Sequence, residues 1–138
     1  MGLHFSKEEF SKRKEKTLNS MKNESVDALI MFRQESMYWL TGYDTFGYVF
    51  FQALILDQKG NVILLTRAPD LRQAQNTSNI NDIRIWVDKD NANPADDLKI
   101  ILDELNLKGK KIVIEYEAYG LTGRNALRLN TVIQNYCS

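Results

Sequence analysis

Residues 26–32 constrain the fold of this chain more than any other segment of the sequence. Apart from Asp27, every residue in this run is apolar, and such a run is typical of a strand that is covered on both faces of a sheet. A strand of that kind requires helices on both sides of the sheet. The run therefore predicts an α/β domain.

The remaining patterns alternate between helix and strand. Residues 57–61 place Gly60 between two apolar runs, which is a hairpin signal, and hairpin strands make the sheet mixed instead of purely parallel. We therefore expect a single domain over residues 1–138, built as a three-layer α/β/α sandwich around a mixed sheet of about five to six strands. The expected strands are residues 26–32, 49–56, 62–66, 82–87 and 111–116, and the expected helices are residues 7–23, 36–41, 70–75, 94–105 and 122–135.

The first helix has a well-marked start. Ser6 is suited to capping its N-terminus, Glu9 lies three residues later as the partner in a capping box, and Phe5 and Phe10 can form a hydrophobic staple. Basic and acidic residues are interleaved along residues 8–16. This helix is therefore expected to present a solvated face and not a track for phosphate groups.

Composition and charge exclude several classes of protein. Eighteen basic and eighteen acidic residues cancel in a chain of 138 residues, so no net field favours nucleic acid or an anionic membrane. No segment has the length and apolar character of a membrane span, and the first residues lack the apolar core of a signal peptide. The single cysteine, Cys137, has no partner for an internal disulfide, which fits a reducing compartment. We expect a soluble cytoplasmic domain.

The sequence lacks the common motifs for catalysis. It has no glycine motif for dinucleotides or phosphates, no Gly-x-Ser-x-Gly and no Cys-x-x-Cys. The only histidine, His4, precedes the first helix, where a mobile tail is expected in place of a catalytic base. Asp96 and Asp97 fall in the first turn of a helix, where acidic side chains favour the helix dipole. Asp88 and Asp90 are expected in a solvated turn, with a weak cation site as the alternative.

Two segments remain as candidates for a functional site. Gly42 is suited to ending a short helix in the left-handed conformation, and residues 43–48 then form a polar and aromatic loop. Such a loop lines a pocket or an interface or, in the alternative interpretation, its rings fill the core. Arg67 follows a strand and precedes a helix. It can pair with a substrate carboxylate or, alternatively, with Asp70 or Asp44 inside the domain.

Taken in order, several segments resemble the N-terminal domain of the prolidase/creatinase family. They are residues 6–10 (SKEEF), 26–30 (VDALI), 38–43 (YWLTGY), 65–67 (LTR) and 114–116 (IEY). The resemblance covers essentially the whole chain and rests on the order of these short motifs. It implies an α/β domain of the ribonuclease H-like kind. Family members are cytosolic hydrolases that act on Xaa-Pro dipeptides, on peptides with an N-terminal Xaa-Pro, or on C–N bonds of creatine and related compounds.

The resemblance also implies what this chain lacks. Family members carry a C-terminal pita-bread domain, which in the peptidases holds a pair of divalent metal ions (Mn, Zn or Co) through aspartates, a histidine and glutamates. No histidine follows His4 in this chain, so the catalytic domain is expected to be absent, together with every catalytic residue and metal ligand. The implied partners are its own C-terminal domain, a second copy in a homodimer, and a small peptide or amino-acid derivative as substrate.

The implied function is a non-catalytic domain that supports dimerisation and covers the active site of the partner subunit. The family projects the loop after the Leu-Thr-Gly motif over that site, which implies roles in the substrate pocket for Tyr43, Asp44, Phe46, Tyr48 and Arg67. Residues 67–74 and 84–88 are more similar to the branch that acts on ectoine or creatine than to the dipeptidases.

Two other classes stay open. A pseudo-peptidase module, of the kind found in relatives of histone chaperones, binds peptides without hydrolysing them. A free-standing receiver-like domain requires clustered acids after its first strand, and a flavodoxin-like domain requires a phosphate loop there. This chain has Arg33 and Gln34 at that point.

Overall fold

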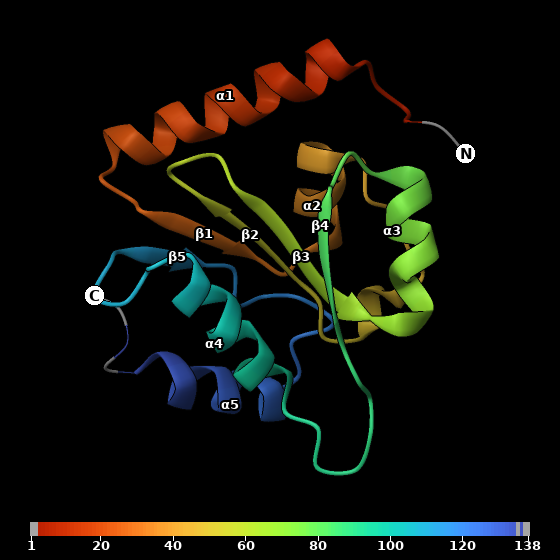
Figure 1. The fold of residues 1–138 in the computed structure, drawn as a ribbon, viewed down its shortest axis with the longest axis vertical. Coiled ribbons are helices and arrows are strands. Elements are labelled where there is room, and N and C mark those ends of the chain that lie inside the picture. The colour runs from red at the N-terminus through yellow and green to blue at the C-terminus, as the bar shows by residue number, and fades with distance from the viewer. Residues whose placement is uncertain (1–2, 135, 137–138) are drawn as a thin grey trace.

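The computed structural model describes residues 3–134 and residue 136 (Figure 1). Its strands are β1 (Ala28–Met31), β2 (Ala53–Asp57), β3 (Val62–Arg67), β4 (Asp82–Trp86) and β5 (Ile112–Ile114). They form one five-stranded sheet in the order β4-β3-β2-β1-β5. The β1–β2 and β2–β3 pairs are antiparallel, whereas β1–β5 and β3–β4 are parallel. The predicted mixed sheet is confirmed.

Helices cover both faces of this sheet. They are α1 (Lys7–Asn23), α2 (Gln34–Thr41), α3 (Leu71–Thr77), α4 (Pro94–Glu104) and α5 (Gly123–Ile133), with two short 3-10 turns, η1 (Gly47–Val49) and η2 (Ala68–Asp70). The first three helices lie on one side of the sheet, and α4 and α5 lie together on the other (Figure 1). The three-layer arrangement is therefore also confirmed.

Alternation along the strands divides the core into two hydrophobic clusters. On β1, Ile30 belongs to the cluster that contains Leu98 of α4 and Leu129 of α5. Its neighbour Met31 belongs to the opposite cluster, with Met37 of α2. Successive side chains of a strand point to opposite faces, so a strand buried on both faces must be apolar throughout. This is the physical origin of the run at residues 26–32.

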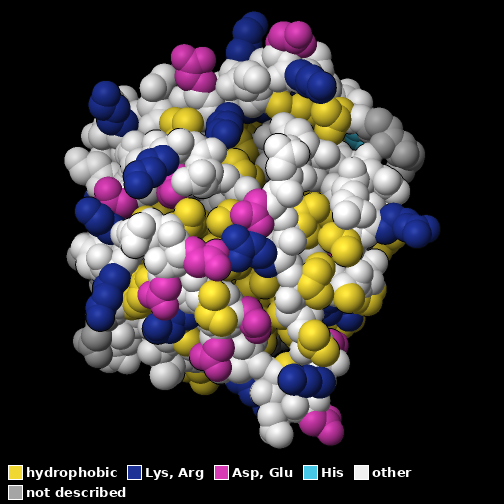
Figure 2. Space-filling view, viewed as in Figure 1, with side chains coloured by type: hydrophobic (Ala, Val, Ile, Leu, Met, Phe, Trp, Pro, Cys, Tyr) yellow, Lys and Arg dark blue, Asp and Glu magenta, His cyan; other side chains and the backbone are white. Residues whose placement is uncertain are grey.

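The start of α1 follows the predicted pattern in part. The Ser6 hydroxyl accepts a hydrogen bond from the Glu9 backbone N–H at 3.1 Å, and the Phe5 and Phe10 rings meet edge-on with centroids 5.9 Å apart. The Glu9 carboxylate does not return to the cap, because it pairs with Arg13 at 3.1 Å. Charged side chains of both signs alternate over the outer surface of α1 (Figure 2).

The predicted strand at residues 49–56 is wrong in its first half. Residues 47–49 form η1, the Phe50 N–H closes this turn on the Gly47 carbonyl at 3.0 Å, and β2 begins only at Ala53. The β1 and β5 strands are shorter than predicted, and α2 begins two residues earlier, at Gln34. Two predictions, on the end of the last helix at residue 135 and on Cys137, lie outside the described residues.

Two further expectations concern the start of the chain and membranes. The ring of His4, expected in a mobile tail, packs edge-on against Tyr38, and its Nδ1 lies 2.5 Å from the Tyr38 hydroxyl. Among the described residues, no helix combines the length and the apolar character needed to cross a membrane.

Candidate functional site

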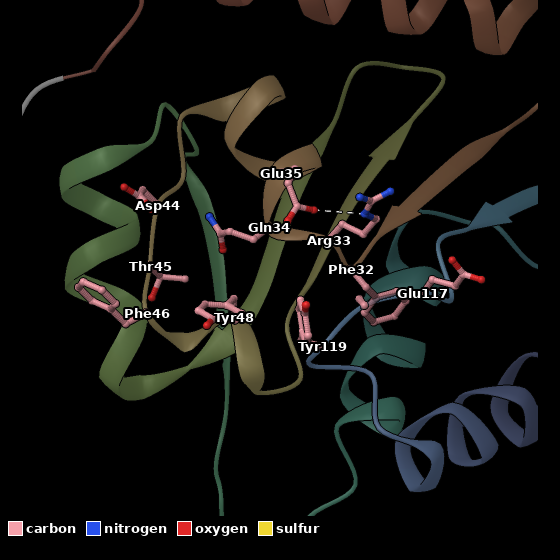
Figure 3. Close-up of a pocket in the computed structure, with 11 residues that line it drawn as sticks. Phe32, Arg33, Gln34, Glu35, Asp44, Thr45, Phe46, Tyr48, Glu117 and Tyr119 are labelled. Atoms are coloured by element: carbon pink, nitrogen blue, oxygen red, sulfur yellow. Dashed lines mark hydrogen bonds and ion pairs between the residues drawn. The ribbon is translucent and has the colours of Figure 1, made fainter.

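A cavity of about 770 Å³ opens at one end of the sheet (Figure 3). Because β1 and β5 are parallel, the segments that follow them end at the same edge. Residues 32–35, at the start of α2, and residues 117–119, after β5, line two sides of the cavity, and residues 44–48 of the loop before β2 complete it. A segment from near the end of the chain thus meets two segments from its first fifty residues.

Three of the five predicted pocket residues line this cavity, namely Asp44, Phe46 and Tyr48. Phe46 is 94 % exposed and Tyr48 is 41 % exposed. In Figure 3 the Phe46 ring points away from Tyr48, towards the outside of the domain. The other two predicted residues, Tyr43 and Arg67, do not line the cavity.

Tyr43 belongs to the core beneath the cavity. Its side chain is fully buried, and its hydroxyl donates a 2.9 Å hydrogen bond to Gln52 Oε1 and lies 3.4 Å from Thr66 Oγ1. Burial, which disfavours the phenolate, raises the pKa of Tyr43 to about 12. Gln34 extends the network, since it accepts a 3.1 Å bond from Gln52 and donates a 2.7 Å bond to the Tyr43 carbonyl.

The loop that carries Phe46 is held from below by Asp70. The Thr45 hydroxyl donates a 2.7 Å hydrogen bond to Asp70 Oδ1 and accepts one from the Gly47 N–H at 2.9 Å. A Cβ on Gly47 would overlap the Asp70 carboxylate, so only glycine allows this approach. These contacts favour the turn η1 over the extended conformation, which explains why the strand begins later than its apolar residues indicate.

Arg67 holds the same loop near its C-terminal end, at Phe50. Its guanidinium carbon lies 3.4 Å from the centroid of the Phe50 ring, and its nitrogens pair with Asp70 at 3.6 Å and Asp88 at 3.8 Å. Its Nε is buried without a hydrogen-bond partner among the described residues. The alternative interpretation, an ion pair inside the domain with Asp70, therefore describes the contacts of Arg67.

The sequence motifs did not indicate Tyr119, Glu35 and Glu117, which also line the cavity. The run 117–120 follows the last strand and places an aromatic residue, Tyr119, directly before a glycine. Glu115 fixes this side of the cavity, because its carboxylate accepts hydrogen bonds from the Phe32 and Arg33 N–H groups, both at 3.1 Å.

The described part of the chain offers no metal site. No three histidine, cysteine, aspartate or glutamate side chains in it are grouped closely enough to hold a metal ion. Of the two acids considered for a weak cation site, Asp88 pairs with Arg67. The resemblance implies the metal pair for a C-terminal domain, and no chemistry of such a pair can be assigned to the described residues of this chain.

Comparison with known proteins identifies the family. The family model for the creatinase/prolidase N-terminal domain matches residues 13–136, and the chain belongs to this family. It is 27 % identical to the uncharacterized hydrolase/peptidase y4tM of Sinorhizobium fredii over 96 % of this chain and 36 % of that protein. It is 30 % identical to ectoine hydrolase of Halomonas elongata over 66 % of this chain and 21 % of that protein.

A solved structure agrees with this family at the level of the fold. The creatinase/prolidase N-terminal domain of an X-Pro dipeptidase from Streptococcus pyogenes matches with a TM-score of 0.69 and 17 % identity, covering 92 % of each chain. The present chain thus has the extent of such a domain, and it spans 36 % and 21 % of the length of the two curated relatives.

Proposed function

We propose that this chain is the non-catalytic N-terminal domain of a cytoplasmic two-domain hydrolase, in which it supports dimerisation and covers the active site of the partner subunit. The observation that carries the proposal is the exposed aromatic surface at the mouth of the cavity, where Phe46 is 94 % and Tyr119 is 81 % exposed. Large exposed apolar patches mark surfaces that another surface covers. The hydrogen bond from Thr45 to Asp70 and the contact of Arg67 with Phe50 hold this aromatic surface in a defined position.

The position of Tyr136 favours a partner subunit over the chain's own continuation. The Tyr136 carbonyl accepts a 2.6 Å hydrogen bond from the Gly109 N–H, which places it before the amino end of β5. The cavity lies beyond the carboxyl end of β5, at Glu117, and residues 109–117 span about 25 Å if extended. Tyr136 therefore lies at the end of the sheet opposite the cavity, which favours a second subunit as the surface that meets the cavity.

The names of the relatives support a small substrate. A proline-containing dipeptide or an ectoine-like compound is in keeping with an X-Pro dipeptidase and an ectoine hydrolase among the similar proteins. If the protein is a peptidase of this class, its metal ions are bound by the C-terminal domain, since the described residues offer no ligand group for them. The domain would then contribute shape and exclusion of water to the pocket.

Kinetics of the full-length protein test the proposal. We expect Phe46→Ala and Tyr48→Ala to lower kcat/KM by about tenfold or more, because misplaced substrate contacts are costly. Metal content and far-UV circular dichroism should stay unchanged. Ile100→Ala is the matched control, since Ile100 is 57 % exposed on α4, away from the cavity. Wild-type kinetics of both aromatic variants on every accepted substrate would contradict the proposal, and peptide binding without any hydrolysis would favour a pseudo-peptidase.

A further inference from the structure

Tyr119 places a second aromatic ring beside Tyr48. The two rings meet edge-on with centroids 5.9 Å apart, although the residues belong to segments on different sides of the cavity (Figure 3). The residue after Tyr119, Gly120, packs against the backbone of residues 48–50 and joins the two segments. Tyr119 is 81 % exposed and Tyr48 is 41 % exposed, so ring surface is open to a ligand.

The charges around this pair are unbalanced. The carboxylates of Glu35, Asp44 and Glu117 line the cavity together with one cation, Arg33. Arg33 pairs with Glu35 at 3.2 Å, which leaves Asp44 and Glu117 without an ion pair among the described residues. Figure 3 shows these two acids on opposite sides of the tyrosine pair. The lining of the cavity therefore carries an excess of negative charge.

We propose that Tyr48 and Tyr119 form a specificity-determining wall for substrates that present a compact cationic group, an ammonium or an amidinium. This rests on the proposed function, in which the partner subunit supplies the opposite wall. A cation within about 6 Å of a tyrosine ring is attracted by the negative ring face. The acids on either side strengthen this attraction. A neutral group of the same shape gains neither contribution.

Binding of simple probes to the 138-residue chain tests the inference. Acetamidinium, methylammonium and neutral acetamide are titrated while the backbone amide resonances are followed by NMR. We expect both cations to shift the resonances around residues 48 and 119, and acetamide to leave them unchanged. A stronger effect of acetamidinium points to a cyclic amidine or guanidine substrate, and a stronger effect of methylammonium points to the amino group of a peptide.

Variants of Tyr119 separate the ring from the fold. Tyr119→Ala should weaken the cation titrations about two- to fivefold, the size expected for an exposed cation–π contact, whereas Tyr119→Phe should retain them. Leu127→Ala is the control, since Leu127 is 70 % exposed on α5 and does not line the cavity. Equal shifts with acetamide, or an unchanged titration of Tyr119→Ala, would overturn the inference.

Failure of this inference is distinguishable from failure of the proposed function. If the probes do not distinguish cations from acetamide but Phe46→Ala still impairs turnover of the full-length protein, the covering role stands and only the cation preference falls. If the Tyr48 and Phe46 variants retain wild-type kinetics, the covering role falls whatever the probes show.

Discussion

Gly120 lies against the carbonyl oxygen of Phe50 so closely that a Cβ at position 120 would overlap it. This contact joins the segment after β5 to the loop before β2, and it therefore sets the spacing of Tyr48 and Tyr119. Gly120→Ala must push the two segments apart, and we expect it to lower the free energy of unfolding by about 1–3 kcal/mol. Urea denaturation measures this change.

Gly123→Ala is the matched control for that substitution. Gly123 is exposed in the first turn of α5, and a Cβ there would meet no atom within 4 Å. This variant should be neutral or slightly stabilising, because alanine has the higher helix propensity. Equal stability of the two variants would show that the Gly120 contact does not constrain the cavity.

Removal of the Thr45 hydroxyl should release the loop that carries Phe46. Thr45→Val has nearly the same shape but lacks the donor to Asp70 and the acceptor for the Gly47 N–H. We expect a loss of about 1–3 kcal/mol in the free energy of unfolding, because Thr45 is buried and its partners stay unsatisfied. Hydrogen exchange of residues 44–50 should accelerate.

Thr131→Val provides the comparison for Thr45→Val. The Thr131 hydroxyl donates a 3.0 Å hydrogen bond to the Leu127 carbonyl, but it is exposed on α5. Its loss should change stability by less than about 0.5 kcal/mol. If Thr45→Val left hydrogen exchange of residues 44–50 at the wild-type rate, the Asp70 contact would not hold the loop.

We expect the domain to lose stability at high pH because the Tyr43 side chain is buried. Burial first, and the negative charge of Asp70 in smaller measure, raise its pKa from 10.0 to about 12. The folded state therefore holds the phenolic proton more tightly than the unfolded state. Its contribution of about 2–3 kcal/mol is fully present below pH 10 and is lost as the pH rises towards 12. Urea denaturation across this range should show a fall that is smaller in Tyr43→Phe, and an equal fall in both would contradict the assignment.

The isolated chain should have no hydrolytic activity. Its described residues lack a group of metal ligands, and water activation between metal ions requires several converging ligands. We therefore expect no turnover of Xaa-Pro dipeptides, creatine or ectoine after addition of manganese, zinc or cobalt. Release of product that depends on added metal and persists after repurification would refute the two-domain interpretation.

Local signals in the sequence predicted much of the fold. Ser6 and Asn93 cap α1 and α4 as expected, because a cap depends on residues only a few positions away. The strand at residues 49–52 was predicted wrongly because Val49 and Phe50 have high strand propensity. Tertiary contacts override that propensity here, since Asp70 holds Thr45 just before this segment and Arg67 packs on the ring of Phe50 within it.

The sequence predicted the loop side of the candidate site but not the side that carries Tyr119. The aromatic loop that carries Phe46 and Tyr48 is continuous in the sequence, and its composition indicated a functional surface. Tyr119 joins it only because β5 pairs with β1 in parallel, which brings the ends of both strands to one edge. That pairing crosses more than eighty residues, and no local pattern reports it.

A mixed-dimer experiment on the full-length protein tests the covering role in trans most directly. One subunit carries Phe46→Ala with Tyr48→Ala and an intact catalytic domain, and the other carries an inactivated catalytic domain and an intact N-terminal domain. If the loop acts across the dimer, mixed dimers show turnover well above that of either parent protein, because one active site then has both intact parts. If purified mixed dimers are no more active than the loop variant alone, the loop does not act on the partner subunit.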